Sequence, residues 1–184
     1  LVPVALALYL LAVYLPAKKG PFRVMGWDLT RPLFDWGWGF LILAGIGIPG
    51  IGFYLLAKNL GINTTVQPAN LTEAWWTVPV LIGLAAKNAI LEEILMVGYL
   101  FTRWKQTGGR LWTILVISAV VRGGYHLYQG FGGFAGNLIM GLVFGWLFLK
   151  FKRVGPLVVA HFLLDVFAFV GYALLAPYLA QFGI

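Results

Sequence analysis

The sequence predicts an all-α, polytopic transmembrane helical bundle, and three observations carry that prediction. Of the 184 residues, 61% are hydrophobic and only 10% are charged, which is too little polar surface to cover a water-soluble globule. Apolar stretches of about 17 to 25 residues recur, the length that a helix needs to cross hydrocarbon about 30 Å thick. Short basic segments separate these stretches. We therefore expect one integral-membrane domain that comprises residues 1–184.

About six spans are expected in the numbered chain, each an apolar run bounded by charged residues, glycine or proline. They cover residues 1–17, 38–57, 75–101, 111–128, 134–149 and 156–175. The first run lacks an initiator methionine and the charged segment of a signal peptide. The numbered chain is therefore expected to begin inside a helix, with further residues upstream.

The net charge of +7 does not indicate nucleic-acid binding, because the basic residues make no continuous face. They gather in the loops 18–36, 102–110 and 150–154, whereas the intervening loops hold almost no lysine or arginine. The positive-inside rule places these three loops in the cytoplasm. We expect a bacterial cytoplasmic membrane as the location, with the lipid bilayer as a partner and no nucleic acid.

Ionisable residues inside the expected spans indicate a functional site. A charged side chain at the bilayer centre costs about 2.5 to 3.5 kcal/mol on insertion scales, so several of them must face one another or a water-filled cavity. The spacing Arg122–His126 recurs in His161–Asp165, four residues in each case, which places each pair on one helix face. The candidate catalytic residues are Glu92, His126, His161 and Asp165, supported by Glu93 and Arg122.

These residue types suit hydrolysis by general-base catalysis. Glu92 and His126 are side chains that can share a water molecule and draw off its proton. Asp165 can orient His161 or fix which of its ring nitrogens carries the proton. A purely structural network of helix-to-helix hydrogen bonds is the alternative, and it is weaker because it leaves the combined cost in lipid without a purpose.

Glu93 directly follows Glu92, and we expect it to have a structural role. Adjacent residues on an α-helix differ in direction by about 100°, so the two carboxylates should not point at the same atom. One of them is then expected to form a structural ion pair. Arg122 is the expected partner of Glu93.

Three ordered segments resemble the motifs of a known family. They are residues 92–98 (EEILMVG), 125–130 (YHLYQG) and 161–165 (HFLLD). Their order, spacing and placement in three separate spans resemble the CAAX protease and bacteriocin-processing family of intramembrane endopeptidases, over residues 87–170. The resemblance implies that Glu92 is the catalytic carboxylate and acts with His126 to activate water. It also implies that His161 and the residue at position 165 stabilise the oxyanion.

Two positions depart from the family pattern. Val97 stands where the first motif has arginine, and Arg122 stands where the second motif has phenylalanine. Such a double exchange can keep one guanidinium beside Glu93 while moving its attachment to a neighbouring helix. We interpret it as compensation that preserves an intact site.

The third motif ends in aspartate, and two histidines with a carboxylate raise the question of a metal cofactor. The family has asparagine or a similar polar residue at position 165, but an ionised Asp165 cannot donate a hydrogen bond. Asp165 must therefore be protonated, or must serve to hold His161 as a donor. The family is often called a metalloprotease, and two histidines with a carboxylate can hold zinc. The sequence lacks the compact His-Glu-x-x-His spacing, so a divalent metal such as zinc is an option and not a requirement.

We expect an intramembrane endopeptidase that hydrolyses a peptide bond of a membrane-associated peptide or protein through water activated by Glu92 and His126. Two alternatives stay open. One is a catalytically silent family member that acts as an assembly or immunity partner in a membrane complex. The other is a proton-coupled transporter that uses the same carboxylates and imidazoles as a relay. The sequence does not identify the substrate.

Overall fold

A computed structural model describes residues 2–15, 20–64 and 74–179. These residues form helices and connecting turns, with one isolated β-bridge between Asn63 and Gly130. The predicted all-α class is therefore confirmed. Part of the first expected span and part of the first basic loop, residues 1 and 16–19, lie outside the described ranges. The elements in chain order are α1 (Val2–Tyr14), α2 (Pro21–Val24), α3 (Pro32–Asn59), α4 (Thr77–Glu92), the π-helix η1 (Glu93–Tyr99), α5 (Leu100–Gln106), α6 (Leu111–Tyr125), the 3-10 helix η2 (Leu127–Gln129), α7 (Phe131–Phe151) and α8 (Gly155–Leu179).

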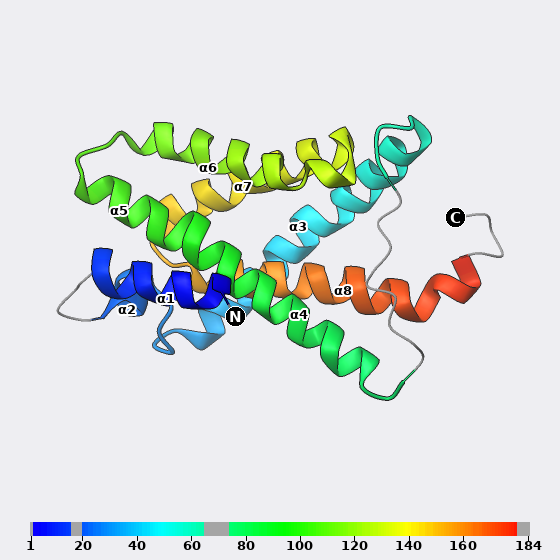
Figure 1. The fold of residues 1–184 in the computed structure, drawn as a ribbon, viewed down its shortest axis with the longest axis horizontal. Helices are drawn as coiled ribbons and strands as arrows, with labels where there is room; N and C mark the ends of the chain where they lie inside the picture. The colour runs from blue at the N-terminus through cyan, green and yellow to red at the C-terminus, as the bar shows by residue number, and fades with distance from the viewer. Residues whose placement is uncertain (1, 16–19, 65–73, 180–184) are drawn as a thin grey trace.

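The bundle has two main packing units that meet at η1. Helix α6 packs along α7, while α8 packs against both α3 and α4 (Figure 1). Glycines on α7 allow a close approach to α6. A Cβ atom on Gly141 would lie 2.9 Å from the Cα atom of Ala119, and one on Gly145 would lie 2.5 Å from Leu115 Cδ1.

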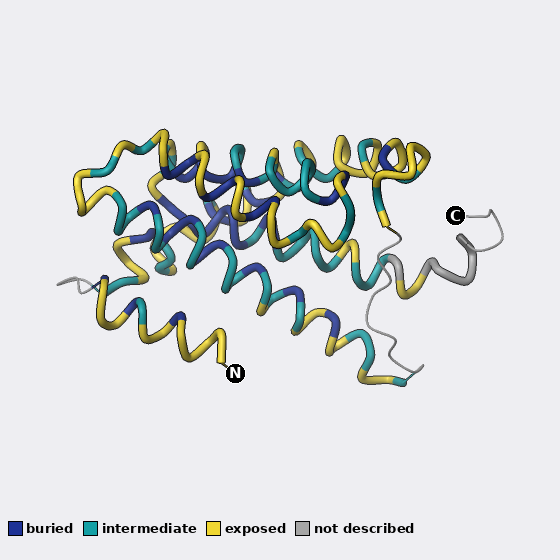
Figure 2. The backbone as a smooth tube through the Cα atoms, turned by 45° about the horizontal axis from the view of Figure 1, so that its top comes forward, coloured by how far each residue is buried: buried dark blue, intermediate teal, exposed yellow. Residues whose placement is uncertain are grey.

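Two helices in the described part of the chain, α3 and α7, are long and apolar enough to cross a membrane. Helix α1, helix α6 and the segment Gly155–Gly171 of α8 are apolar but shorter. Only 11% of the most apolar part of α3 is buried inside the structure, and buried segments gather in the middle of the bundle (Figure 2). The outer surface of α3 is thus apolar and free to face lipid. Six complete spans remain a prediction.

The expected span 111–128 is wrong at its C-terminal end, because α6 ends at Tyr125. His126 has backbone angles φ −95° and ψ 4°, and the short helix η2 follows it. Gly123 and Gly124 directly precede this end, and adjacent glycines are poor helix formers. His126 therefore lies just beyond the helix that carries Arg122.

The π-helix η1 continues α4 and leads directly into α5. A π-helix has i→i+5 hydrogen bonds and turns less per residue than an α-helix, and such segments often lie at functional sites. Side-chain hydroxyls bind two of its carbonyls: Ser118 Oγ donates to the Met96 carbonyl oxygen at 2.8 Å, and Thr102 Oγ1 donates to that of Gly98 at 2.6 Å. Because Ser118 lies on α6, its bond fixes η1 against that helix.

Arg153 lies just before α8 and fixes the start of this helix to α3 and to the turn that precedes α3. Its guanidinium donates to Asp35 Oδ1 at 2.9 Å and Oδ2 at 2.7 Å, and to Asp28 Oδ1 at 3.0 Å. Gly26 has a positive φ of 68°, and a Cβ atom there would lie 2.6 Å from the Cα atom of Arg153. We call Arg153, Asp28 and Asp35 the Arg153 cluster. It holds in place the helix that carries His161.

Arg153→Gln is expected to lower the free energy of unfolding by about 2 kcal/mol, because it removes charge-assisted hydrogen bonds to two carboxylates. The measurement is thermal unfolding of the purified protein in detergent. Arg31→Gln is the matched control, because Arg31 is an exposed arginine of the same region. Its Cζ atom lies 4.2 Å from the centroid of the Phe34 ring. Equal unfolding temperatures for the two variants would contradict the role given to the cluster.

Candidate functional site

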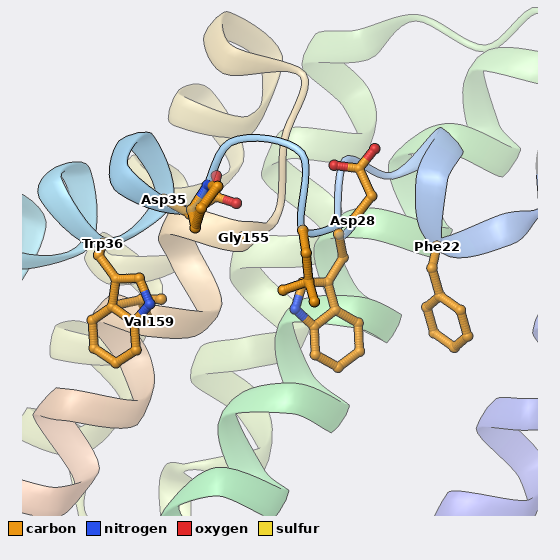
Figure 3. A pocket seen from close by; sticks show the side chains of 9 residues that line it. Phe22, Asp28, Asp35, Trp36, Gly155 and Val159 are labelled. Atoms are coloured by element: carbon orange, nitrogen blue, oxygen red, sulfur yellow. The ribbon is translucent and has the colours of Figure 1, made fainter.

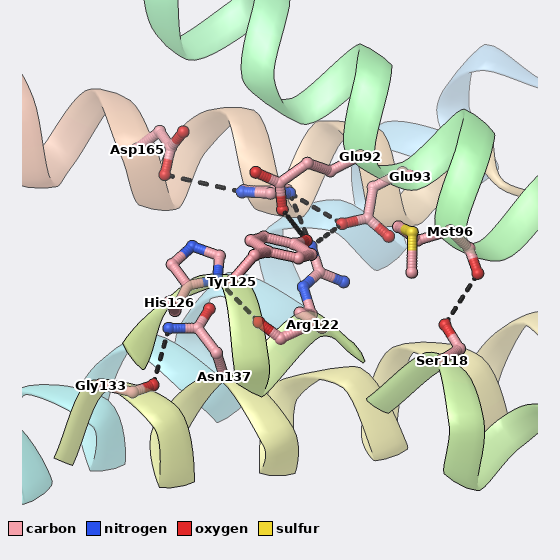
Figure 4. Close-up of polar contacts among 11 residues, drawn as sticks. Glu92, Glu93, Met96, Ser118, Arg122, Tyr125, His126, Gly133, Asn137 and Asp165 are labelled. Carbon is pink, nitrogen blue, oxygen red and sulfur yellow. Dashed lines mark hydrogen bonds and ion pairs between the residues drawn. The ribbon is translucent and has the colours of Figure 1, made fainter. Parts of the chain in front are cut away.

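All six candidate residues belong to one polar network built from the continuous α4–η1 segment, α6 and α8. Figure 4 shows Glu92, Glu93, Arg122, His126 and Asp165 among them. Glu92 ends α4 and Glu93 begins η1, Arg122 lies in the last turn of α6, and α8 carries both His161 and Asp165. His126 joins the network through its Nδ1 atom, which lies 3.0 Å from the Arg122 carbonyl oxygen. We call these six residues, together with Tyr125, the polar cluster.

A fully buried ion pair forms the centre of the polar cluster. Arg122 Nη2 contacts Glu93 Oε1, and the exposed fractions of the two side chains are 1% and 0%. The predicted pairing of Glu93 with Arg122 is thus confirmed. The same nitrogen also lies 3.4 Å from Glu92 Oε2.

The expectation that Glu92 and Glu93 cannot point at one atom is therefore wrong. The π-helix begins at Glu93, and its smaller turn per residue brings the directions of neighbouring side chains closer than the α-helical 100° or so. The long glutamate side chains reach the remaining distance. The two carboxylates still differ in environment, since the Glu92 side chain is 24% exposed and Glu93 is fully buried.

His161 is held by Glu93 more closely than by Asp165. Its Nδ1 atom lies 2.7 Å from Glu93 Oε1, whereas its Nε2 atom lies 3.6 Å from Asp165 Oδ1. A carboxylate oxygen only accepts, so we assign a proton to Nδ1. The expected orienting role of Asp165 thus belongs first to Glu93, and Asp165 faces the opposite nitrogen of the ring.

Tyr125 is a member of the polar cluster that sequence reasoning missed. Its hydroxyl donates a hydrogen bond to Glu92 Oε2 at 2.6 Å, and its ring lies 4.6 Å from the His126 ring, centroid to centroid. The search for charged groups inside spans passed over it, because a phenol is neutral near pH 7. The available signal was its position three residues after Arg122, which places both on one helix face.

Several buried polar atoms of the cluster are not bonded to the described part of the protein. They are Glu93 Oε2, Arg122 Nε and Arg122 Nη1. The Arg122 guanidinium also lies over the Phe144 ring, 5.3 Å from its centroid. Buried groups that keep hydrogen-bonding capacity are uncommon and call for an explanation, such as ordered water or a functional role.

The polar cluster does not fit zinc. Among the described residues, no group of three or more histidine, aspartate or glutamate side chains is placed to hold a metal ion. Arg122 Nη2 contacts both Glu93 Oε1 and His161 Nδ1, and the positive charge of the guanidinium opposes a cation there. We therefore derive no catalytic step through a metal.

A surface cavity of about 380 Å³ lies apart from the polar cluster (Figure 3). It is lined by Phe22, Trp27, Asp28, Leu29, Pro32, Asp35, Trp36, Gly155 and Val159. None of the candidate catalytic residues lines it. Asp28 and Asp35, the carboxylates of the Arg153 cluster, belong to its wall.

The family model described as "Type II CAAX prenyl endopeptidase Rce1-like" matches residues 74–167, just over half of the chain. The chain belongs to this Rce1-like family. No curated protein and no solved structure matches the chain. Together with the apolar helices α3 and α7, family membership indicates an integral membrane protein.

Proposed function

We propose that the protein is an intramembrane endopeptidase that hydrolyses a peptide bond in a membrane-associated peptide or protein. One observation carries the proposal: two adjacent glutamates lie in one network but in different environments. Glu93 is fully buried in an ion pair, whereas Glu92 is 24% exposed. A pair of carboxylates whose surroundings separate them in this way is typical of an acid or base with a structural neighbour.

Glu92 is the proposed general base. As a water oxygen attacks the carbonyl carbon of the substrate, Glu92 accepts one water proton, and it later gives that proton to the leaving amine. His126 is proposed to help hold the water. Its Nδ1 atom is bonded to the Arg122 carbonyl, and its Nε2 atom has no partner among the described residues, so this nitrogen is available.

His161 and Asp165 are proposed to stabilise the tetrahedral oxyanion. Glu93 accepts from Nδ1 of His161, so Nε2 can donate to an oxyanion only when it also carries a proton. Asp165, 3.6 Å from Nε2, is the group that favours this doubly protonated ring. An ionised Asp165 thus acts through His161, which resolves the difficulty of a carboxylate that cannot itself donate.

The family description makes a prenylated CAAX peptide the first substrate to test. The purified protein in lipid nanodiscs would be incubated with a farnesylated CAAX peptide, with the same peptide lacking the farnesyl group, and with unrelated membrane-spanning peptides. Mass spectrometry would locate any cut. We expect cleavage of at least one membrane-associated peptide. If no peptide is cut, the proposal fails and a silent partner in a membrane complex is favoured. Proton flux into proteoliposomes without cleavage would favour a transporter.

A further inference from the structure

Among the described residues, the hydrogen-bond donors to Glu92 all reach the same oxygen. The Tyr125 hydroxyl donates to Oε2 at 2.6 Å and Arg122 Nη2 lies 3.4 Å from the same atom. No described residue bonds the other oxygen, Oε1. A carboxylate held by one oxygen has a fixed direction for the second, and that second oxygen is the one left to take a proton from water.

Tyr125 also connects Glu92 to His126. The His126 ring packs against the Tyr125 ring with centroids 4.6 Å apart and planes inclined by 40°. The described structure contains no direct hydrogen bond between Glu92 and His126, and Figure 4 shows the Tyr125 ring beside both. Tyr125 is therefore a side chain that contacts both proposed catalytic groups, beside the weaker link through Arg122.

We propose that Tyr125 is a positioning residue that aims Glu92 Oε1 at the water shared with His126. This inference rests on the proposed hydrolytic function. The phenol keeps its proton throughout, so no bond forms or breaks at Tyr125, and its contribution is to hold Glu92 in the productive orientation. Arg122 holds the same oxygen more loosely and is already engaged by Glu93, so it does not replace the phenol.

Tyr128 supplies a matched control. The Tyr128 and His126 rings are stacked with centroids 6.2 Å apart. The Tyr128 hydroxyl, however, accepts from Gln129 Nε2 at 3.0 Å. Tyr125→Phe and Tyr128→Phe thus each remove one phenol hydroxyl from a tyrosine whose ring lies near His126. Only the first change removes a hydrogen bond to Glu92.

The test measures kcat and KM for the peptide that the wild type cleaves fastest. Tyr125→Phe is expected to lower kcat about tenfold, the effect of one lost hydrogen bond to a charged group, with KM unchanged and the protein still folded. Tyr128→Phe should match the wild type. In a Glu92→Gln background, Tyr125→Phe should cause no further loss, because its effect passes through the carboxylate. Replacement of Tyr125 by 4-aminophenylalanine, which retains a donor, should restore much of kcat.

Two results would overturn the inference and leave the proposed function standing. One is full activity in Tyr125→Phe while Glu92→Gln is inactive. The other is an equal loss from Tyr125→Phe in the presence and absence of Glu92, which would assign Tyr125 a role independent of the base. Full activity in Glu92→Gln would instead refute the proposed function itself.

Discussion

Glu92→Gln is expected to lower cleavage by about 100-fold or more and to leave the fold intact. Glutamine keeps the shape of glutamate, and its amide oxygen can still accept from the Tyr125 hydroxyl, but it cannot take a proton from water. The Glu92 side chain is partly exposed, and Arg122 keeps Glu93 as its partner, so loss of the Glu92 charge leaves Arg122 paired. The measurement is the cleavage rate in nanodiscs, with the unfolding temperature as a check of integrity.

Glu93→Gln is the matched control, one residue along the same helix. It should lower the unfolding temperature more than Glu92→Gln does, because Arg122 and His161 both lose their charged partner in the core. Cleavage that survives Glu92→Gln would contradict the assignment of the base.

A chelator should leave wild-type cleavage unchanged, whereas loss of activity that zinc restores would indicate a metal-bound water.

Arg122→Phe should destabilise the protein by about 3 to 5 kcal/mol, the effect of removing one partner from a buried ion pair. It leaves Glu93 charged and fully buried with only His161 beside it. Val97 lies four residues after Glu93, is 1% exposed and occupies the position of the family arginine. Arg122→Phe combined with Val97→Arg should therefore recover much of the lost stability.

A double-mutant cycle measured by thermal unfolding in detergent tests this exchange. Val97→Arg alone should be destabilising, because it buries a second guanidinium beside the one that already pairs with Glu93. The two changes should then be strongly coupled, with the double variant more stable than either single one. Additive effects would show that Val97 and Arg122 are not alternative attachment points for one arginine.

The amino-acid composition and the apolar runs predict the fold class of this protein. They do not predict the detailed geometry of the polar cluster. Apolar runs gave the all-α class because their length and polarity leave few other folds. The pairing of Arg122 with Glu93 was predictable because charges inside apolar segments must find partners. The hydrogen bond from His161 to Glu93 was not, since it depends on how α8 packs against η1, and sequence spacing carries no information on packing between distant helices.

The Arg153 cluster was missed for a different reason. Basic residues after a span are explained by the positive-inside rule, and that explanation hid the one arginine of its loop that is buried against Asp28 and Asp35. Tyr125 was missed because a neutral phenol attracts no notice among charged groups. For Arg153 the deciding quantity is burial, and for Tyr125 it is the hydrogen bond to Glu92; charge alone reveals neither.

The π-helix also determines the register of a long buried stripe. Leu81, Ala85, Ala89, Glu93, Val97 and Phe101 are all buried and follow one another at intervals of four. On an α-helix, four residues overshoot a full turn by about 40°, so such a stripe would wind off its face. The smaller turn per residue of η1 stops that drift between Glu93 and Val97 and so helps to keep Phe101 in the core. Deleting one residue within η1 would rotate the helix beyond it by about 100° and separate Phe101 from the face that carries Glu93.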